Sequence, residues 1–290
     1  MNLSGVPVAN VYHAGSAWPF HASTHARPVG RPPAARRGLV TAPISGPTDL
    51  SGTTAVVTGA AGAIGRATCD ALAREGADVV ATDVTDDGLA EAAARVEAHG
   101  RDATTVQADV TDPDAVARLR DRATDAGDVG IVATVHGIVS RTDLTEMTLD
   151  DWRTQIDVNL TGTMLVVQAF YDDLRDREYG KIVCVGSVAG QVGGVISGPN
   201  YVASKAGVHG FVRWVARNGA PDGVYANAVA PGPVWSPMTE NEPGYDDEMT
   251  PLNRLGEPED IAEAIVFLSG QGSNWITGTV LDVNGGISIG

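Results

Sequence analysis

A tyrosine and a lysine four residues apart carry the clearest chemical signal in this chain. Tyr201 and Lys205 lie in a stretch of helical periodicity, and a helix places residues at this spacing on one face, about one turn apart. A free tyrosine keeps its proton up to about pH 10, whereas a neighbouring ammonium lowers the tyrosine pKa. Such a pair can donate a proton in one direction of a reaction and accept it in the other. The same spacing also occurs in plain helix-surface contacts.

The pattern around this pair predicts an α/β fold. From Asp49 onward, short runs rich in Val, Ile and Ala alternate with stretches of helical periodicity. This rhythm is typical of a single doubly wound parallel sheet (Rossmann-like) with helices on both faces. Strands are expected at 54–58, 78–81, 104–107, 129–134, 181–185, 225–229 and 279–282, and helices at 63–75, 86–99, 152–174 and 200–218. Ligands bind such sheets at the carboxyl ends of the strands, where the strand order reverses.

A glycine-rich turn follows the first expected strand and reads Thr-Gly-Ala-Ala-Gly-Ala-Ile-Gly from Thr58 to Gly65. Glycines allow a sharp turn and let a pyrophosphate approach the amides of the next helix, whose dipole favours an anion. Asp83 follows the second strand, 18 residues after Gly65. A carboxylate there accepts hydrogen bonds from ribose hydroxyls and repels a 2'-phosphate, which favours NAD over NADP. A helix cap is the alternative role for Asp83.

Together these motifs resemble the short-chain dehydrogenase/reductase family. The turn is similar to the family's Thr-Gly-x-x-x-Gly-x-Gly, with Ala63 where the middle glycine is expected, and the resemblance runs from about residue 50 to the end of the sequence. It implies four catalytic residues, which occur in the family's order: Asn159, Ser187, Tyr201 and Lys205. By resemblance, the main chain of Asn159 holds a water linked to Lys205, and the Ser187 hydroxyl orients the substrate oxygen.

The resemblance also implies a set of cofactor contacts. These are Gly59, Gly62, Ile64, Gly65, Asp83, Asp109, Val110, Gly137, Tyr201, Lys205, Pro231, Gly232, Val234 and Ser236. Asp109 and Val110 match an adenine-contacting pair, with a turn cap as the alternative role of Asp109. The largest departure is Thr-Val-His-Gly at 134–137, where the family usually shows Asn-Asn-Ala-Gly. We expect His136 to pack or hydrogen-bond at its strand end rather than to act in catalysis.

The function expected from these residues is that of an NAD-dependent oxidoreductase. It would transfer a hydride between nicotinamide and a neutral secondary alcohol or ketone, such as a sugar, polyol, cyclic alcohol or steroid. Residues 191–199 and 238–250 are expected to shape the substrate pocket, and Trp235 either walls it or packs under the lid. The nearest alternative is a 3-oxoacyl-carrier-protein reductase, but its acidic partner and usual NADPH disagree with the acidic chain and Asp83. A non-catalytic NAD-binding regulator is the third hypothesis.

Composition sets the remaining expectations for this acidic protein. The formal net charge is -16, which argues against a nucleic-acid partner and reflects either GC-rich coding or adaptation to high salt. No apolar run is long enough to span a membrane, so we expect a soluble protein. Cys69 and Cys184 are expected to be free buried thiols in the cytoplasm. The histidines show no metal-ligand spacing, and the family resemblance implies a homotetramer.

Residues 1–48 differ from everything after them. They contain no Asp or Glu, are rich in Pro, Gly, Ala and His, and carry arginines at positions 27, 31, 36 and 37. Without hydrophobic periodicity, this segment is expected to be disordered or draped on the acidic body, with a targeting segment or a misassigned start as alternatives. Residues 49–290 are then the dinucleotide-binding catalytic domain.

Overall fold

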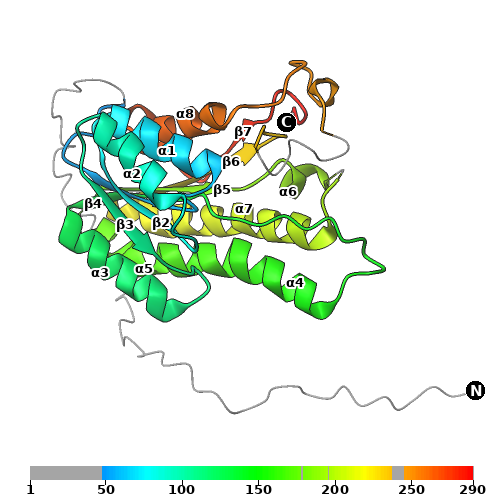
Figure 1. The fold of residues 1–290 in the computed structure, drawn as a ribbon, viewed down its shortest axis with the longest axis horizontal. Helices are drawn as coiled ribbons and strands as arrows, with labels where there is room; N and C mark the ends of the chain where they lie inside the picture. Colours follow the sequence, from blue (N-terminus) through cyan, green and yellow to red (C-terminus); the bar gives the residue numbers. More distant parts are fainter. Residues whose placement is uncertain (1–47, 178, 195, 237–244, 290) are drawn as a thin grey trace, which may run out of the picture. The chain divides into compact units, whose positions relative to one another are not determined.

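Seven parallel strands form one sheet in the computed structural model, which describes residues 48–177, 179–194, 196–236 and 245–289 (Figure 1). The expected N-terminal extension lies outside these residues apart from Thr48. The strands follow the order β3-β2-β1-β4-β5-β6-β7. Their bounds are β1 Thr54–Thr58, β2 Asp78–Asp83, β3 Ala103–Gln107, β4 Val129–Thr134, β5 Gly180–Val185, β6 Val224–Pro231 and β7 Val280–Val283. The described residues form one compact unit.

Helices cover both faces of the sheet, as the alternating pattern predicts (Figure 1). One face packs against α1 (Ala63–Arg74), α2 (Leu89–Ala98) and α8 (Pro258–Ser269), and the other against α3 (Pro113–Ala126), α5 (Gly162–Asp176) and α7 (Pro199–Gly219). Side chains of a strand alternate between these two cores: Ala55 and Val57 of β1 enter the first, and Val56 enters the second. The central strands β1, β4 and β5 are buried along their whole length, which explains why most of their residues are apolar.

The strand order reverses between β1 and β4. From β1 the chain moves outward to β2 and β3, then returns to pair β4 on the other side of β1. The loops that follow β1 and β4 therefore leave in opposite directions and open a crevice at the carboxyl end of the sheet. This crevice is where a ligand is expected.

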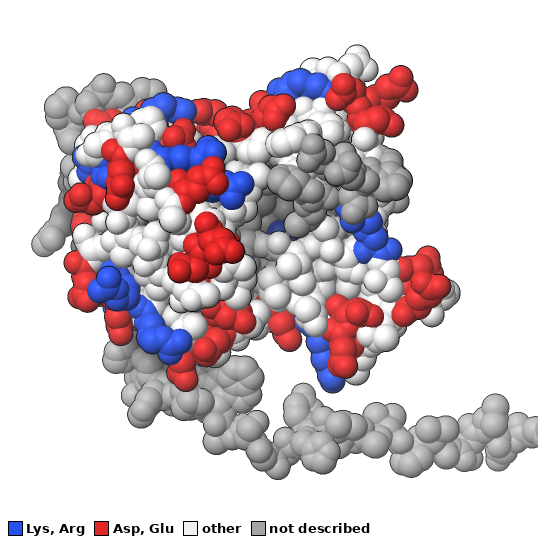
Figure 2. Space-filling model, viewed as in Figure 1, with Lys and Arg blue, Asp and Glu red and all other residues white. Residues whose placement is uncertain are grey.

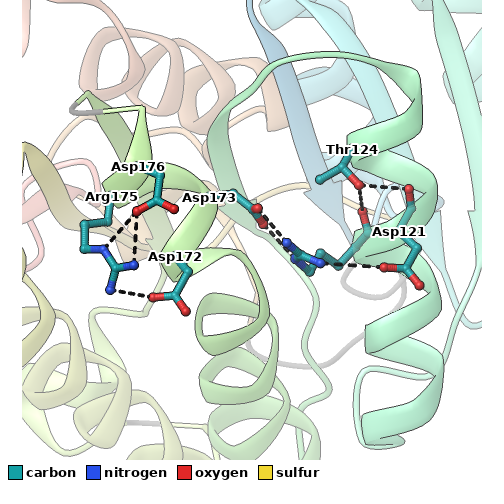
Figure 3. Close-up of polar contacts among 7 residues, drawn as sticks. Asp121, Thr124, Asp172, Asp173, Arg175 and Asp176 are labelled. Carbon is teal, nitrogen blue, oxygen red and sulfur yellow. Dashed lines mark hydrogen bonds and ion pairs between the residues drawn. The ribbon is translucent and has the colours of Figure 1, made fainter. Parts of the chain in front are cut away.

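An ion pair joins two helices on the second face. The guanidinium of Arg120 in α3 donates two hydrogen bonds to the carboxylate of Asp173 in α5, at 2.7 and 2.8 Å. Figure 3 shows Asp173 between the two helices, with the separate cluster of Asp172, Arg175 and Asp176 at the end of α5. Paired oxygens and nitrogens in this fork geometry hold α5 against α3.

The long helical pattern expected at 152–174 is interrupted. It begins at Leu149 in α4 (Leu149–Ile156), where Thr148 and Asp151 form a reciprocal capping box. A π-helical turn, η1 (Asp157–Thr161), then joins α4 to α5. Periodicity did not predict this turn, because one inserted residue barely changes the apolar spacing. The helix expected from residue 86 also begins later, at Leu89 after Gly88.

The shorter elements complete the domain. A single turn of helix, α6 (Ala189–Val192), precedes α7, and three 3-10 turns are η2 (Ala220–Asp222), η3 (Asp247–Met249) and η4 (Gln271–Ser273). In the described part of the chain, no helix is long and apolar enough to cross a membrane. Cys69 and Cys184 are both free and buried, as expected.

A buried lysine lies at the amino end of β5, whereas the crevice lies at the carboxyl ends of the strands. Lys181 is 1% exposed, donates to the Ser273 hydroxyl at 3.0 Å and lies 4.0 Å from the ring centre of Tyr225. Burial lowers the pKa of Lys181 to about 8. The hydroxyl and the aromatic face stabilise the cation only in part.

We predict that Lys181 makes stability rise in alkali. Between pH 8 and its unfolded pKa of about 10.5, the unfolded chain binds a proton that the folded chain has lost, so the free energy of unfolding increases with pH. Relative to Lys181→Met, the wild type should gain about 3 kcal/mol over this range. Denaturant unfolding of both proteins from pH 7 to 10.5 measures the difference. A difference that stays constant with pH contradicts the prediction.

Candidate active site

One large cavity of about 1,030 Å³ lies along the carboxyl ends of the strands. Its wall includes every residue that the sequence assigned to cofactor contact, from Gly59 in the first loop to Ser236 after β6. Ser187, Tyr201 and Lys205 also line it, whereas Asn159 does not. The fold therefore gathers loops that are far apart in the sequence around one space, while the roles of these residues stay predictions.

The glycine turn makes the tight connection from β1 to α1. Gly59 has a φ of +67°, and a Cβ there would lie 2.6 Å from the main chain of His136. A Cβ at Gly65 would collide with the carbonyl oxygen of Gly59. Both positions thus require glycine for close backbone packing, while Ala63 at the expected middle glycine causes no break in α1.

The start of α1 fits an anionic group. Gly62 caps the helix without any side-chain hydrogen bond, and the first turn contains no acidic residue. No side-chain cap therefore satisfies the first N–H groups of α1. Gly62, Ala63 and Ile64, at this end of the helix, form part of the cavity wall. Together with the dipole, these amides suit the pyrophosphate of a dinucleotide.

Asp83 is held firmly at the end of β2. One carboxylate oxygen accepts the main-chain N–H of Ala61 at 3.1 Å, and the other accepts the N–H and hydroxyl of Thr85 at 3.1 and 3.2 Å. The side chain thereby ties the glycine turn to the β2 loop. It does not cap α2, whose N-cap is Gly88. Arg66, the cation on the same wall, is bound to the Ala61 carbonyl and lies 3.5 Å from Glu91.

Asp109 takes one of the two roles that the sequence left open, the turn cap, while its contact with adenine stays a prediction. Its carboxylate accepts the N–H and hydroxyl of Thr111 at 2.8 and 2.7 Å, which makes it a turn-capping residue. Asp109 and Val110 also line the cavity beside Asp83. The turn holds Val110 against α5, where Gly162 leaves room for its methyl groups.

Tyr201 and Lys205 rise from the same face of α7, as their spacing predicts. Pro199 starts this helix after Gly198, which places Tyr201 in its first turn. The ammonium of Lys205 donates to the carbonyl of Val185 at 2.8 Å and lies 5.9 Å from the ring centre of Tyr201. A hydrogen bond between the Tyr201 phenol and Ser187 joins α7 to the loop after β5.

The pKa of Tyr201 moves in the opposite direction from the sequence-based expectation. Burial raises it, the nearby phenol of Tyr245 raises it further, and only the hydrogen bond with Ser187 lowers it. Lys205 does not lower it in the protein alone. Burial instead lowers the pKa of Lys205 itself, to about 8, because desolvation disfavours the ammonium. Desolvation is therefore the largest influence on the pKa of both groups.

Asn159 lies behind the cavity wall in the π-helical turn. Its side-chain oxygen accepts the N–H of Ile138 at 2.9 Å, and its amide donates to the Ile138 carbonyl and the Ser204 hydroxyl, both at 3.0 Å. The Asn159 carbonyl accepts the Thr163 hydroxyl at 2.8 Å. A Cβ at Gly137 would lie 3.2 Å from the Lys205 ammonium and 3.3 Å from Asn159, so this glycine lets the two groups approach.

His136 connects the ends of β1 and β4 with η1 and α5. Its Nδ1 bonds to the Thr58 hydroxyl, and its Nε2 lies 3.4 Å from the Thr163 hydroxyl. The main chain of Val158 also hydrogen-bonds the ring, but burial and the charge of Lys205 lower the His136 pKa to about 3. The imidazole is thus neutral and acts as a hydrogen-bonded strut, in agreement with the expectation that it packs or hydrogen-bonds.

The cavity wall also contains a set of uncharged, mostly apolar residues. These are Val139, Val188, Val192, Ile196, Ser197, Tyr245, Met249 and Ile287. None of these carries a charge. The segment 238–244 and Pro237 lie outside the described residues, whereas Tyr245 and Met249 from the expected lid do line the cavity.

Trp235 does not wall this cavity. It lines a separate shallow hollow with Arg254, Glu257 and Asp260, so the first of its two expected placements is wrong. The main chain explains the difference, because the Trp235 N–H pairs with the Gly256 carbonyl at 2.7 Å and turns the side chain outward. Sequence reasoning in turn missed His209, which is buried beneath Ser187. Its spacing of four from Lys205, on the face already chosen, was the available signal.

Comparisons with known proteins identify the family. A family model described as enoyl-(acyl carrier protein) reductase matches residues 59–288. The chain is 39% identical over 246 residues to 3-oxoacyl-[acyl-carrier-protein] reductase of Synechocystis sp., covering 83% of this chain and 98% of the relative. It is 36% identical over 258 residues to the (3R)-3-hydroxyacyl-CoA dehydrogenase of Canis lupus familiaris, covering 84% and 99%. It is 38% identical over 239 residues to the cis-4-hydroxycyclohexanecarboxylate dehydrogenase of Sinomonas cyclohexanicum, covering 80% and 95%.

Solved structures agree with these relatives. A short-chain type dehydrogenase/reductase from Mycobacterium marinum superposes with a TM-score of 0.79 at 30% identity, covering 84% of this chain and 98% of that one. A blue fluorescent protein from a metagenomic library, solved in complex with NADPH, gives 0.78 at 31% identity, covering 83% and 100%. The chain therefore belongs to the short-chain dehydrogenase/reductase family. It is an oxidoreductase that acts on CH–OH or keto groups with a nicotinamide cofactor.

Proposed function

We propose that this protein is an NAD-dependent dehydrogenase or reductase for a neutral secondary alcohol or ketone. The observation that carries the proposal is the cluster of Ser187, Tyr201 and Lys205 on the wall of a cavity whose other end holds the glycine turn and Asp83. Such an arrangement puts a proton-transfer group within one cavity with a dinucleotide cradle.

Each of the three residues has one task in this proposal. The Ser187 hydroxyl holds the substrate oxygen, and the Tyr201 phenol takes its proton during oxidation or returns it during reduction. Lys205 keeps positive charge near the phenol, from a position fixed by the Val185 carbonyl. Asn159 holds the loop at Ile138 and bonds to Ser204, the residue before Lys205. A bound nicotinamide supplies the hydride acceptor or donor, and the protein supplies position and charge.

The choice of NAD rests on Asp83. Both of its oxygens are held by neutral donors, namely the Ala61 amide and the Thr85 amide and hydroxyl, so its negative charge is not neutralised by a cation bound to it. A ribose with two free hydroxyls can donate to this carboxylate, whereas a 2'-phosphate would be repelled. Arg66 is near, but its hydrogen bond to Ala61 and its proximity to Glu91 engage it elsewhere.

The apolar lining favours a cyclic alcohol or steroid over a sugar or polyol. Burying several hydroxyls against Val192, Ile196 and Met249 would leave them without partners, which is costly. The similarity to a dehydrogenase named for cis-4-hydroxycyclohexanecarboxylate supports a ring-shaped alcohol.

The second candidate is a 3-oxoacyl-carrier-protein reductase, favoured by the name of the Synechocystis relative. An acidic carrier protein would meet a chain of net charge -16, and NADPH would meet Asp83. On the face seen in Figure 2, acidic side chains are spread widely over the surface. A cofactor-binding regulator without turnover is the third candidate. NAD binding without activity on any substrate tested would favour it.

We also propose a cytoplasmic homotetramer adapted to high salt. Two free buried thiols suit a reducing compartment. Leu149 and Trp152 of α4 and Trp214 of α7 expose apolar surface on the long helices after β4 and β5, where copies of the chain would pack. Molar salt would screen the repulsion that arises from the net charge of -16 of the whole chain.

Replacement of Tyr201 tests the mechanism. Tyr201→Phe should lower kcat at least about 100-fold, because it removes the proton-transfer group. The Kd for NADH should stay within about threefold, since the ring remains. Tyr179→Phe is the matched control, because that phenol bonds to Asn274 outside the cavity. The assay follows nicotinamide absorbance over cyclic alcohols, hydroxysteroids, sugars, polyols and 3-hydroxyacyl thioesters. Full activity of Tyr201→Phe would refute the mechanism.

Replacement of Asp83 tests the cofactor. Asp83→Asn keeps the shape but removes the charge, so kcat/KM with NADP should rise about tenfold or more while that with NAD falls. Asp86→Asn, on the exposed part of the same loop, should change neither. A wild type that already prefers NADP would contradict the NAD assignment and favour the second candidate.

Light scattering tests the assembly and its salt dependence. The wild type should have the mass of four chains in molar KCl, and its melting temperature should rise with added KCl because screening weakens self-repulsion. Trp214→Glu should reduce the mass by adding charge to the exposed face of α7. A monomer in molar KCl, or a melting temperature that does not respond to salt, would contradict the corresponding part of the proposal.

A further inference from the structure

His209 continues the line of functional side chains on α7. It stands four residues after Lys205 and eight after Tyr201, and it is 3% exposed. The proposed mechanism gives it no task. Its ring lies under the loop that carries Ser187, because the Ser187 main-chain N–H points at its Nε2 over 3.4 Å.

The direction of the Ser187 amide follows from the sheet. The N–H groups of Gly186 and Val188 bond to β6, at Val229 and Pro231, over 2.8 and 2.9 Å. Amides along a strand point alternately to its two neighbours, so the Ser187 N–H faces the β4 side. There β4 pairs with β5 only as far as Thr134 and Cys184.

Beyond the end of β4, two side chains of α7 bond to the main chain that follows Cys184. Lys205 donates to the Val185 carbonyl at 2.8 Å, and His209 accepts from the Ser187 amide. One donor and one acceptor, one helical turn apart, thus satisfy two successive polar groups on the open side of the chain after β5. Because both come from the helix that carries Tyr201, they set the distance between α7 and Ser187.

The fit between His209 and this loop requires glycine at position 186. A Cβ on Gly186 would collide with Nε2 of His209 and lie 2.6 Å from its Cδ2. The imidazole therefore lies directly against the Gly186 backbone. A ring in this position can be displaced by a single methyl group.

His209 can accept this hydrogen bond only as a neutral ring with its proton on Nδ1. Burial lowers the His209 pKa to about 4, with further lowering by Arg213 and Lys205, and Asp282 opposes the shift. The ring is therefore neutral at every pH at which Lys205 and Tyr201 titrate.

We propose that His209 is a positioning residue that holds Ser187 in register with Tyr201. The inference rests on the proposed function, in which Ser187 holds the substrate oxygen. His209 acts through the main chain of Ser187, whose hydroxyl is also anchored by the Ala189 N–H at 3.1 Å.

Two substitutions of similar size separate positioning from packing. His209→Gln keeps an acceptor near the place of Nε2, whereas His209→Leu fills the space without one. We expect His209→Leu to lower kcat about 10- to 100-fold, since small misplacements of a reacting group have effects of this size. His209→Gln should stay within about threefold of wild type, and the Kd for NADH should not change in either. His99→Gln, on the surface beside Asp70, is the control.

The steric contact gives a second test. Gly186→Ala should lower kcat strongly, and adding His209→Ala should restore part of the loss by making room for the methyl group. Equal activity of His209→Leu and wild type, or strictly additive effects of Gly186→Ala and His209→Ala, would overturn the proposal.

A spectroscopic measurement covers the case in which the variants do not fold. In the wild type, the nitrogen chemical shifts of His209 should report a neutral ring with the proton on Nδ1 from pH 5.5 to 9. A proton on Nε2 would overturn the proposal. Ser187→Ala distinguishes failure of the proposed function from failure of the positioning role. Full activity of Ser187→Ala would refute the role of Ser187 in holding the substrate oxygen. Loss of activity in Ser187→Ala but not in His209→Leu would refute only the positioning role of His209.

Discussion

The buried ammonium of Lys205 is the constraint on which the site depends. Lys205 is 4% exposed, and in the described part of the chain its ammonium donates to the Val185 carbonyl and pairs with no carboxylate within 4.0 Å. A cation in such surroundings needs fixed dipoles. The separation between the end of β5 and the axis of α7 must therefore stay constant. Gly137 provides the space on the other side. The cost of this burial is visible in the lowered pKa of Lys205.

Two neutral imidazoles complete this arrangement. His136 ties the ends of β1 and β4 to the π-helical turn, and His209 ties α7 to the loop after β5. Burial keeps both rings neutral, so they accept or donate hydrogen bonds without adding charge near Lys205. His136 stands in the part of the chain that departs most from the family pattern, and it supplies there a polar connection between strand ends.

The two ends of the cavity differ in charge. Near the glycine turn, Asp83 and Asp109 are carboxylates held by amides and hydroxyls. Another part of the described lining is uncharged and mostly apolar. In the proposed function, this separation gives polar recognition to the cofactor and shape recognition to the substrate, with Ser187 and Tyr201 at the boundary.

The sequence alone determined the doubly wound sheet, the glycine turn, the placement of Asp83 and the shared helix face of Tyr201 and Lys205. These follow from local periodicity and spacing, which depend on residues close together in the chain. Only the tertiary structure decided the raised pKa of Tyr201, the outward turn of Trp235 and the contact of His209 with Ser187. Each depends on burial or on a partner from a distant element, and desolvation is set by everything that surrounds a group rather than by its neighbours in sequence.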